Sequence, residues 1–173
     1  MRRTVCLNPE EAFHIHTWRC RHAGDEREDA YIRAAMYLGA KQITFTDHAP
    51  FPGDFFRGRM KMADLPEYIE TLSELKDKHQ GKIQVRIGLE AEYLPGFQTY
   101  YEKLREEERI EYLLLGQHFY ELAPGTYSFS MKDKSGQADG MIRAELAGVE
   151  SGYFSGVAHP ERSYRYLQPG ESA

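Results

Sequence analysis

The chain is poor in cysteine and has no long apolar run. Cys6 and Cys20 are its only cysteines, too few for a disulfide framework, so a reducing compartment is favoured. No stretch of about 18 consecutive apolar residues is present, and the N-terminal residues lack the apolar segment of a signal peptide. We therefore expect a cytoplasmic protein with no membrane partner.

Basic residues are fewer than acidic ones. The 173 residues include 22 Lys and Arg against 27 Asp and Glu, which gives a net charge of −5. An acidic balance without a basic stripe argues against nucleic acid as a partner. Repeats, low-complexity segments and long linkers are missing as well, so we expect residues 1–173 to form one domain.

Signatures of covalent catalysis and of nucleotide binding are absent too. The sequence contains no G-x-S-x-G motif and no P-loop, and neither cysteine lies in a reactive motif. Any catalytic site must therefore be built from other groups.

Strand and helix patterns alternate along the chain. Short apolar or alternating segments predict strands, and longer segments with apolar residues at helical spacing predict helices. The predicted strands cover residues 12–16, 42–46, 83–89, 111–115 and 153–158. The predicted helices cover residues 25–38, 64–79, 97–108 and 136–148, with an irregular excursion at 125–134. This alternation predicts an α/β fold with a parallel sheet or barrel and helices outside it.

Histidine and glutamate recur at the carboxyl ends of the predicted strands. The first strand carries two histidines one residue apart, which period two places on one face. The residues in question are His14, His16, His48, Glu90, His118 and His159. Because the carboxyl ends of parallel strands meet at one rim of a barrel, imidazole and carboxylate groups there predict a site for Zn, Fe or Mn. A single histidine at a strand end is more often a hydrogen-bonded core side chain, but five such strand ends favour a metal cluster. His79 falls outside the pattern, at the polar end of a helix, and is expected to be solvated.

The ordered motifs resemble the PHP (polymerase and histidinol phosphatase) superfamily, and within it the histidinol-phosphatase-like metal-dependent phosphoesterases. They are H-I-H with a third histidine six residues on, T-D-H-A-P, G-L-E-A-E-Y, G-Q-H and G-V-A-H-P-E-R, and they extend over nearly the whole chain. The resemblance implies a distorted (β/α)7 TIM-like barrel. It also implies up to three Zn, Mn or Fe ions per chain and hydrolysis of phosphate esters.

The resemblance further implies roles for individual residues. The implied metal ligands are His14, His16, His22, His48, Glu90, His118 and His159. In this arrangement His14 and His16 bind one ion, and Glu90 bridges it to a second ion, which His118 and His159 complete. His22 and His48 hold the third ion. Glu90 and His118 would act in catalysis. Asp47 would either fix an imidazole by a hydrogen bond or simply cap its loop.

Arginines would bind the phosphate oxygens that the metals leave free. Arg162, three residues after the last metal-ligand candidate, is the first choice, and Arg19 and Arg21 are weaker ones. For each of them the alternative is an arginine on a solvated surface. The segment at 50–62, rich in Phe, Met, Gly and Pro, predicts either a substrate lid or a loop that packs its apolar side chains on the rim.

The implied function is hydrolysis of a phosphate monoester by a metal-bound hydroxide, with histidinol phosphate, a small phosphorylated metabolite of histidine biosynthesis, as the substrate. A nuclease or proofreading domain of the same superfamily is disfavoured by the acidic charge balance. The alternative from another class is a truncated or degenerate metal-binding or interaction module with little or no catalytic activity.

One family motif has no counterpart in the sequence. No Asp-x-His follows His159. In the family that motif supplies one ligand to the first metal and one to the third, so the resemblance implies weaker binding at those two sites. About five βα units are present, so we expect an incomplete barrel whose edges lie at residues 12–16 and 153–158. Open edges can pair with another chain, which predicts a homo-oligomer.

Overall fold

The computed structural model describes residues 10–54, 56–119 and 137–162. Within them, five parallel strands form one sheet in the order β1-β2-β3-β4-β5. The strands are β1 (Glu11–Ile15), β2 (Gln42–Phe45), β3 (Gln84–Ala91), β4 (Tyr112–Leu115) and β5 (Gly156–Val157). The helices are α1 (Glu28–Tyr37), α2 (Leu65–Lys78), α3 (Gln98–Glu106) and α4 (Gln137–Glu150), and a 3-10 turn, η1 (Met62–Asp64), precedes α2.

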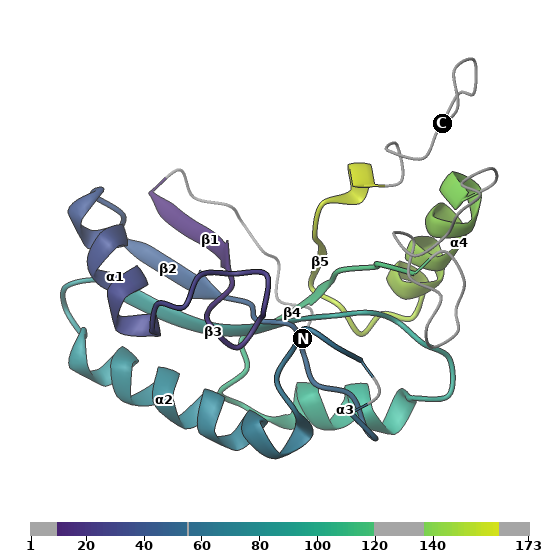
Figure 1. Ribbon diagram of the computed structural model, residues 1–173, viewed down its shortest axis with the longest axis horizontal. Coiled ribbons are helices and arrows are strands. Elements are labelled where there is room, and N and C mark those ends of the chain that lie inside the picture. Colours follow the sequence, from purple (N-terminus) through teal and green to yellow (C-terminus); the bar gives the residue numbers. More distant parts are fainter. Residues whose placement is uncertain (1–9, 55, 120–136, 163–173) are drawn as a thin grey trace.

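The sheet curls into an open half-barrel, with α2 and α3 along its convex side and α4 beyond β4 (Figure 1). The predicted α/β architecture, with its strand and helix order, is confirmed. The predicted excursion at 125–134 lies outside the described residues. The last strand shortens to two residues because Tyr153 and Phe154 turn away to pack on the ring of Tyr101, with centroids 5.2 and 5.7 Å from it.

Alternation along β3 explains how one strand serves both the core and the site. Val85, Ile87 and Leu89 point to the helices and belong to the buried core. Each such aliphatic side chain stabilises the fold by about 1.5–3 kcal/mol through burial. Tyr68 of α2 donates a hydrogen bond from its hydroxyl to the carbonyl of Gly88 at 2.8 Å, which fixes the helix against the strand. Because successive side chains of a strand point to opposite faces, Glu90 points to the other, concave face of the sheet.

His79 is buried, so the expectation of a solvated side chain was wrong. Only 7% of the residue is exposed, and its Nε2 lies 2.8 Å from Oδ1 of Asp29 on α1. The hydrogen bonds from His79 and Lys78 lower the pKa of Asp29 to about 2. The end of α2 packs against a helix far away in sequence, and local polarity does not reveal such a neighbour.

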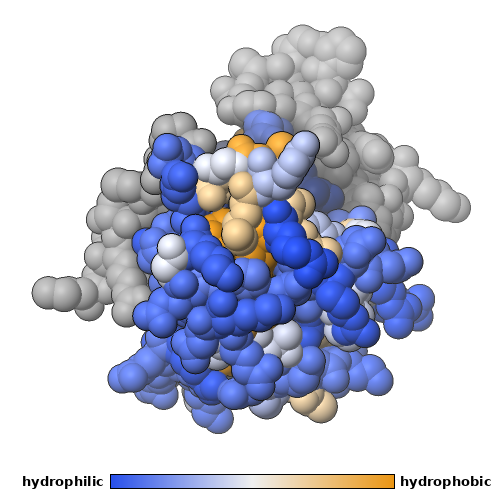
Figure 2. Space-filling model, turned by 90° about the vertical axis from the view of Figure 1, so that its left-hand side faces the viewer, coloured by the Kyte–Doolittle hydropathy of each residue, from blue (hydrophilic) through white to orange (hydrophobic). Residues whose placement is uncertain are grey.

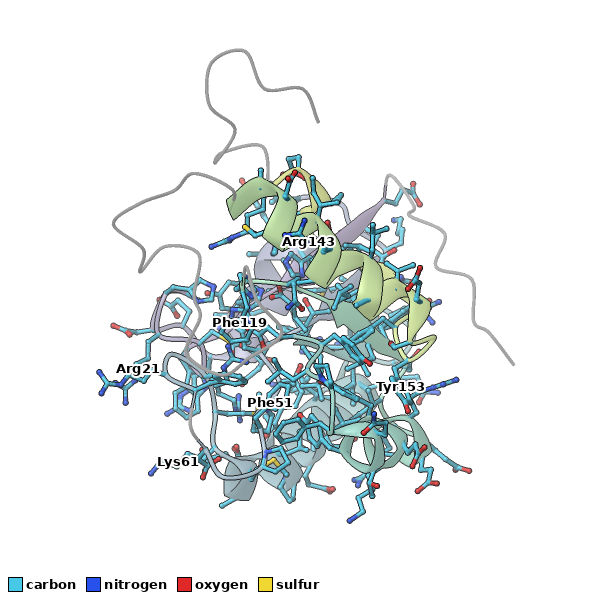
Figure 3. All side chains as sticks on the ribbon, turned by 90° about the vertical axis from the view of Figure 1, so that its right-hand side faces the viewer. Arg21, Phe51, Lys61, Phe119, Arg143 and Tyr153 are labelled. Carbon is cyan, nitrogen blue, oxygen red and sulfur yellow. The ribbon has the colours of Figure 1, made fainter. Side chains whose placement is uncertain are left out.

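The segment at 50–62 is anchored by its apolar side chains. Phe51, Phe56 and Met60 are 1%, 6% and 5% exposed. The ring of Phe51 lies 5.0 Å from that of Tyr100, and the ring of Phe56 lies 5.0 Å from that of Phe119. Figure 3 shows the Phe51 and Phe119 side chains inside the molecule. The geometry favours a loop packed on the rim over a substrate lid.

The two edges of the sheet are β1 and β5, which stand apart in Figure 1. The side that carries β1 and α1 is mostly hydrophilic, with a small apolar area in a hollow (Figure 2). Pairing of these edges with a second chain stays a prediction. Across the described ranges, no helix combines the length and apolar character needed to cross a membrane.

Candidate metal centre

The site is centred on the carboxylate of Glu90, whose side chain is 1% exposed. Its Oε2 atom faces three imidazoles. The distances are 3.9 Å to Nε2 of His14, 3.1 Å to Nε2 of His16 and 3.3 Å to Nδ1 of His48. These histidines come from β1, from the residue after β1 and from the end of β2, so the predicted convergence at the carboxyl ends of the strands is present.

The other oxygen of the same carboxylate faces a second pair of imidazoles. Oε1 of Glu90 lies 3.0 Å from Nε2 of His159 and 3.6 Å from Nε2 of His118. Each oxygen therefore lies nearest to different histidines. This is the geometry that a carboxylate needs in order to bridge two ions.

Main-chain hydrogen bonds lock the T-D-H turn onto β3. The amide of Glu90 donates to the carbonyl of Asp47 at 3.0 Å, and the amide of Ala49 donates to the carbonyl of Glu90 at 2.7 Å. His48 and Glu90 thus form a parallel bridge beyond the end of β2. These hydrogen bonds extend the pairing of β2 with β3 by a few residues and so hold the His48 imidazole beside the Glu90 carboxylate.

Two of the site histidines have left-handed backbone conformations. The φ angle is 64° at His14 and 44° at His159, a region in which residues other than glycine are strained by about 1–2 kcal/mol. The register of β1 on β2 is irregular between Ala12 and Ile15. A bulge of this kind re-aims side chains. Simple period-two alternation is therefore not what brings His14 and His16 together, although their rings do lie 4.8 Å apart.

Three imidazoles are held by their Nδ1 atoms, so that Nε2 faces Glu90. The Nδ1 partners are Thr46 Oγ1 for His14 at 2.8 Å, Cys20 Sγ for His16 at 3.3 Å and Glu92 Oε1 for His118 at 3.0 Å. Histidines that bind metals are commonly oriented in this way, because a partner at one ring nitrogen fixes the other toward the ion.

The electrostatics of the site suit cations better than protons. Burial lowers the pKa of His48 to about 3 and that of His14 to about 4, although the nearby carboxylate of Glu90 acts in the opposite direction. Burial would raise the pKa of Glu90, but the imidazoles of His159 and His16, whose Nε2 atoms lie 3.0 and 3.1 Å from the carboxylate, outweigh it and hold that pKa well below its usual range. At neutral pH the site therefore combines the Glu90 anion with the neutral imidazoles of His14 and His48, the forms that bind metals.

Several buried ligand atoms fit a metal because the protein leaves them unsatisfied. Among the described residues, Oε2 of Glu90, Nδ1 of His48 and Nδ1 of His159 are buried without a hydrogen-bond partner. Such atoms are costly unless something else pairs with them. A divalent cation between Oε2 and Nδ1 of His48 would satisfy two of the three.

In the described part of the chain, four groups of three side chains have ligand atoms within 4.8 Å of one another. They are His16–His22–His48, His14–Glu90–His159, His16–Cys20–Asp47 and His48–Glu90–His118. All seven predicted ligands belong to at least one group, and the exposed His22 joins through rings 5.0 Å from His16 and 5.1 Å from His48. Three of these groups combine histidines that the family resemblance assigned to different ions, and two of them combine histidines that face different oxygens of Glu90. The assignment of each histidine to an ion therefore stays a prediction.

The contacts of Asp47 favour one of the two roles considered for it. Its carboxylate is fully buried and accepts hydrogen bonds from the backbone amide and the hydroxyl of Thr17, at 2.7 and 2.9 Å. Within the described ranges no hydrogen bond joins it to an imidazole. Asp47 instead fastens the loop after β1, in line with the alternative of a loop-capping aspartate.

The three candidate arginines lie in different surroundings. The Arg19 side chain is 3% exposed and forms ion pairs with Glu28 and with Glu67, the latter at 2.6 Å, so two carboxylates already occupy its guanidinium. Arg21 is exposed and points away from the molecule (Figure 3). Arg162 follows His159 in a tight turn, with its amide donating to the His159 carbonyl at 3.0 Å. Its Nε is buried without a hydrogen-bond partner among the described residues. Arg162 therefore stays the phosphate-binding candidate, whereas the guanidinium of Arg19 is already shared between two carboxylates.

Sequence reasoning missed two residues that shape the site. Glu92 accepts a hydrogen bond from His118, and its spacing of two residues from Glu90 was a usable signal. Gly116 lies against Glu90 so closely that a Cβ there would come 1.8 Å from Oε1. A glycine after a strand has too many possible roles for this one to be read from sequence.

Comparison with known proteins places the chain in a family. The PHP domain family matches residues 12–159. A probable histidinol-phosphatase of Deinococcus radiodurans is 31% identical over 169 residues, covering 90% of this chain and 63% of the relative. The histidinol-phosphatase of Bacillus subtilis is 36% identical over 91 residues, which are 49% of this chain and 34% of the relative.

The fold has a counterpart among solved structures. Histidinol phosphate phosphatase from Lactococcus lactis, complexed with zinc, L-histidinol and phosphate, superposes with a TM-score of 0.72 at 21% identity, over 90% of this chain and 59% of that one. The fold and the histidines at its rim place the chain in the class of α/β half-barrels with a candidate metal centre. Within that class, the chain belongs to the PHP domain family. It spans less than two thirds of the length of these relatives.

Acidification should destabilise the metal-free protein. Because the pKa of His48 is about 3 in the folded state and 6.5 for an ordinary histidine, the unfolded chain binds more protons below pH 6.5. Stability is therefore lost as pH falls, by about 1 kcal/mol from this histidine between pH 7 and pH 5.5. Urea unfolding of the chelator-treated chain at both pH values measures the loss. His48→Gln should reduce the pH dependence by that amount, and an equal dependence in the two proteins would contradict the assignment.

Proposed function

We propose that the chain is a metal-dependent phosphatase that hydrolyses a phosphate monoester of the histidinol phosphate type, releasing histidinol and phosphate. The proposal rests on the placement of the Glu90 carboxylate, whose two buried oxygens face different imidazoles. The similarity to histidinol-phosphatases supports the substrate class. A cytoplasmic location and the absence of nucleic-acid and membrane partners stay predictions.

The ions would be Zn, Mn or Fe, held by the imidazoles and shared through Glu90. Bound divalent ions neutralise the charge of a phosphate ester and lower the pKa of water toward neutrality. The chain's own residues keep the ligands in the required form. Burial holds His14 and His48 neutral, and Glu90 stays ionised because nearby imidazoles stabilise its charge.

The phosphate group would be oriented by Arg162. A guanidinium can donate two parallel hydrogen bonds to phosphate oxygens. Arg162 comes directly after the β5 end that delivers His159. Its position three residues after His159 and a buried Nε without a hydrogen-bond partner in the described part of the chain support this role over that of a surface arginine.

Removal of the metal should abolish turnover reversibly. Phosphate release from histidinol phosphate and from p-nitrophenyl phosphate is measured on the chain as purified, after chelation and after addition of Zn, Mn or Fe. We expect chelation to reduce release at least about 100-fold and one of the metals to restore it. A chain that binds metal yet releases no phosphate from either substrate would support the metal-binding module and contradict the phosphatase.

A further inference from the structure

A buried carboxylate next to the site belongs to neither group of candidate ligands. Glu92 lies just past the end of β3 and is fully buried, on the same side as Glu90. Its Oε1 accepts a hydrogen bond from Nδ1 of His118 at 3.0 Å. An ionised carboxylate can only accept, so the ring proton of His118 lies on Nδ1 and the lone pair of Nε2 is directed to the Glu90 side.

The charge of Glu92 is balanced by one arginine from the segment at 50–62. Nη1 and Nη2 of Arg59 donate to the two carboxylate oxygens at 2.5 and 2.8 Å, and the Arg59 side chain is 4% exposed. The guanidinium also lies over the ring of Phe56, 4.7 Å from its centroid. Burial alone would raise the pKa of Glu92, but the charge of Arg59 outweighs it and keeps that pKa well below its usual range.

We propose that Arg59 and Glu92 form a buried positioning pair, which holds His118 with its Nδ1 proton on Glu92 and its Nε2 free to bind a metal. The inference rests on the proposed function, because it takes His118 as a ligand. Neither residue of the pair touches the reacting atoms. A partner carboxylate fixes the ring orientation and raises the basicity of the free nitrogen.

The pair also connects the aromatic loop to the metal centre. Arg59 is fixed by a segment whose Phe51 and Phe56 are buried against Tyr100 and Phe119. Phe119, which directly follows His118, packs against Phe56 of the loop. Arg59 of the same loop pairs with Glu92, and Glu92 in turn accepts the hydrogen bond from the His118 imidazole. The position of His118 therefore depends on residues about 60 positions earlier in the sequence.

The test separates positioning from a purely structural role by removing both charges together. Removing one partner alone would leave a buried unpaired charge and destabilise the fold, whereas an apolar pair of similar size avoids this. The variant is Arg59→Met combined with Glu92→Leu, and its control is Arg109→Met combined with Glu107→Leu, an exposed ion pair far from the site. Zn affinity is measured by competition with a chelating dye, with the thermal midpoint recorded in parallel.

We expect the buried double variant to lose 10- to 100-fold in Zn affinity with its thermal midpoint retained, and the exposed control to keep both. The metal-free wild-type chain supplies a second measurement that needs no variant. Its ¹⁵N spectrum should show the His118 proton on Nδ1, and a proton on Nε2 would overturn the proposal.

His118→Ala distinguishes the two levels of failure. If this variant binds Zn as tightly as wild type, the ligand set of the proposed function is wrong. If it loses affinity while the Arg59–Glu92 double variant does not, the positioning pair alone is overturned.

Discussion

Replacing Glu90 by glutamine should abolish tight metal binding and reduce phosphate release by about 1000-fold. The amide has nearly the same shape, but it has no negative charge and only one oxygen to share. Two groups of imidazoles face the two oxygens of the wild-type carboxylate, so both ion positions should be lost together. The metal contribution to phosphate hydrolysis amounts to several kcal/mol, hence about three decades in rate. Metal content and initial rates measured on the same preparation check the prediction.

Glu102→Gln is the matched control, because Glu102 is exposed on α3 and away from the site. It should retain full metal content and full turnover. The account would fail if the Glu90 variant kept its metals and its rate, or if both variants lost activity to the same extent.

Gly116→Ala should disable the site without changing a single ligand. A Cβ at this position would lie 1.8 Å from Oε1 and 2.4 Å from Cδ of Glu90, so the carboxylate must move away from its histidines. Displacement of the bridging group should lower metal affinity by about 100-fold, and overpacking should cost about 1–3 kcal/mol of stability. Titration with Zn and urea unfolding measure the two effects.

Gly156→Ala gives the comparison for this substitution. Gly156 lies on the adjacent strand β5, and a Cβ there would find only Leu114 at 3.5 Å, an ordinary contact. This variant should bind metal like wild type. Equal metal affinity in the Gly116 variant would show that Glu90 can adopt another rotamer without losing its function.

The site residues that follow buried strands were predictable from the sequence. His48, Glu90, His118 and His159 each come after an apolar run, and parallel strands end at one rim. Their convergence thus depends on strand order alone, which local patterns and the family resemblance both indicate. The α/β architecture was predictable for the same reason.

Predictions failed where the partner of a side chain comes from a distant element. Arg19 pairs with Glu28 and Glu67, and His79 with Asp29, on helices that local sequence cannot place next to them. The strained φ angle of His14 follows from an irregular register, which depends on how two strands meet.

Diffraction from a crystal grown with zinc, recorded at the zinc absorption edge, tests the central claim most directly. The account predicts two anomalous peaks on opposite sides of the Glu90 carboxylate, each about 2.0–2.2 Å from one of its oxygens and from at least one imidazole nitrogen. An anomalous map without a peak beside Glu90, at full zinc concentration and with the histidines in place, would contradict it.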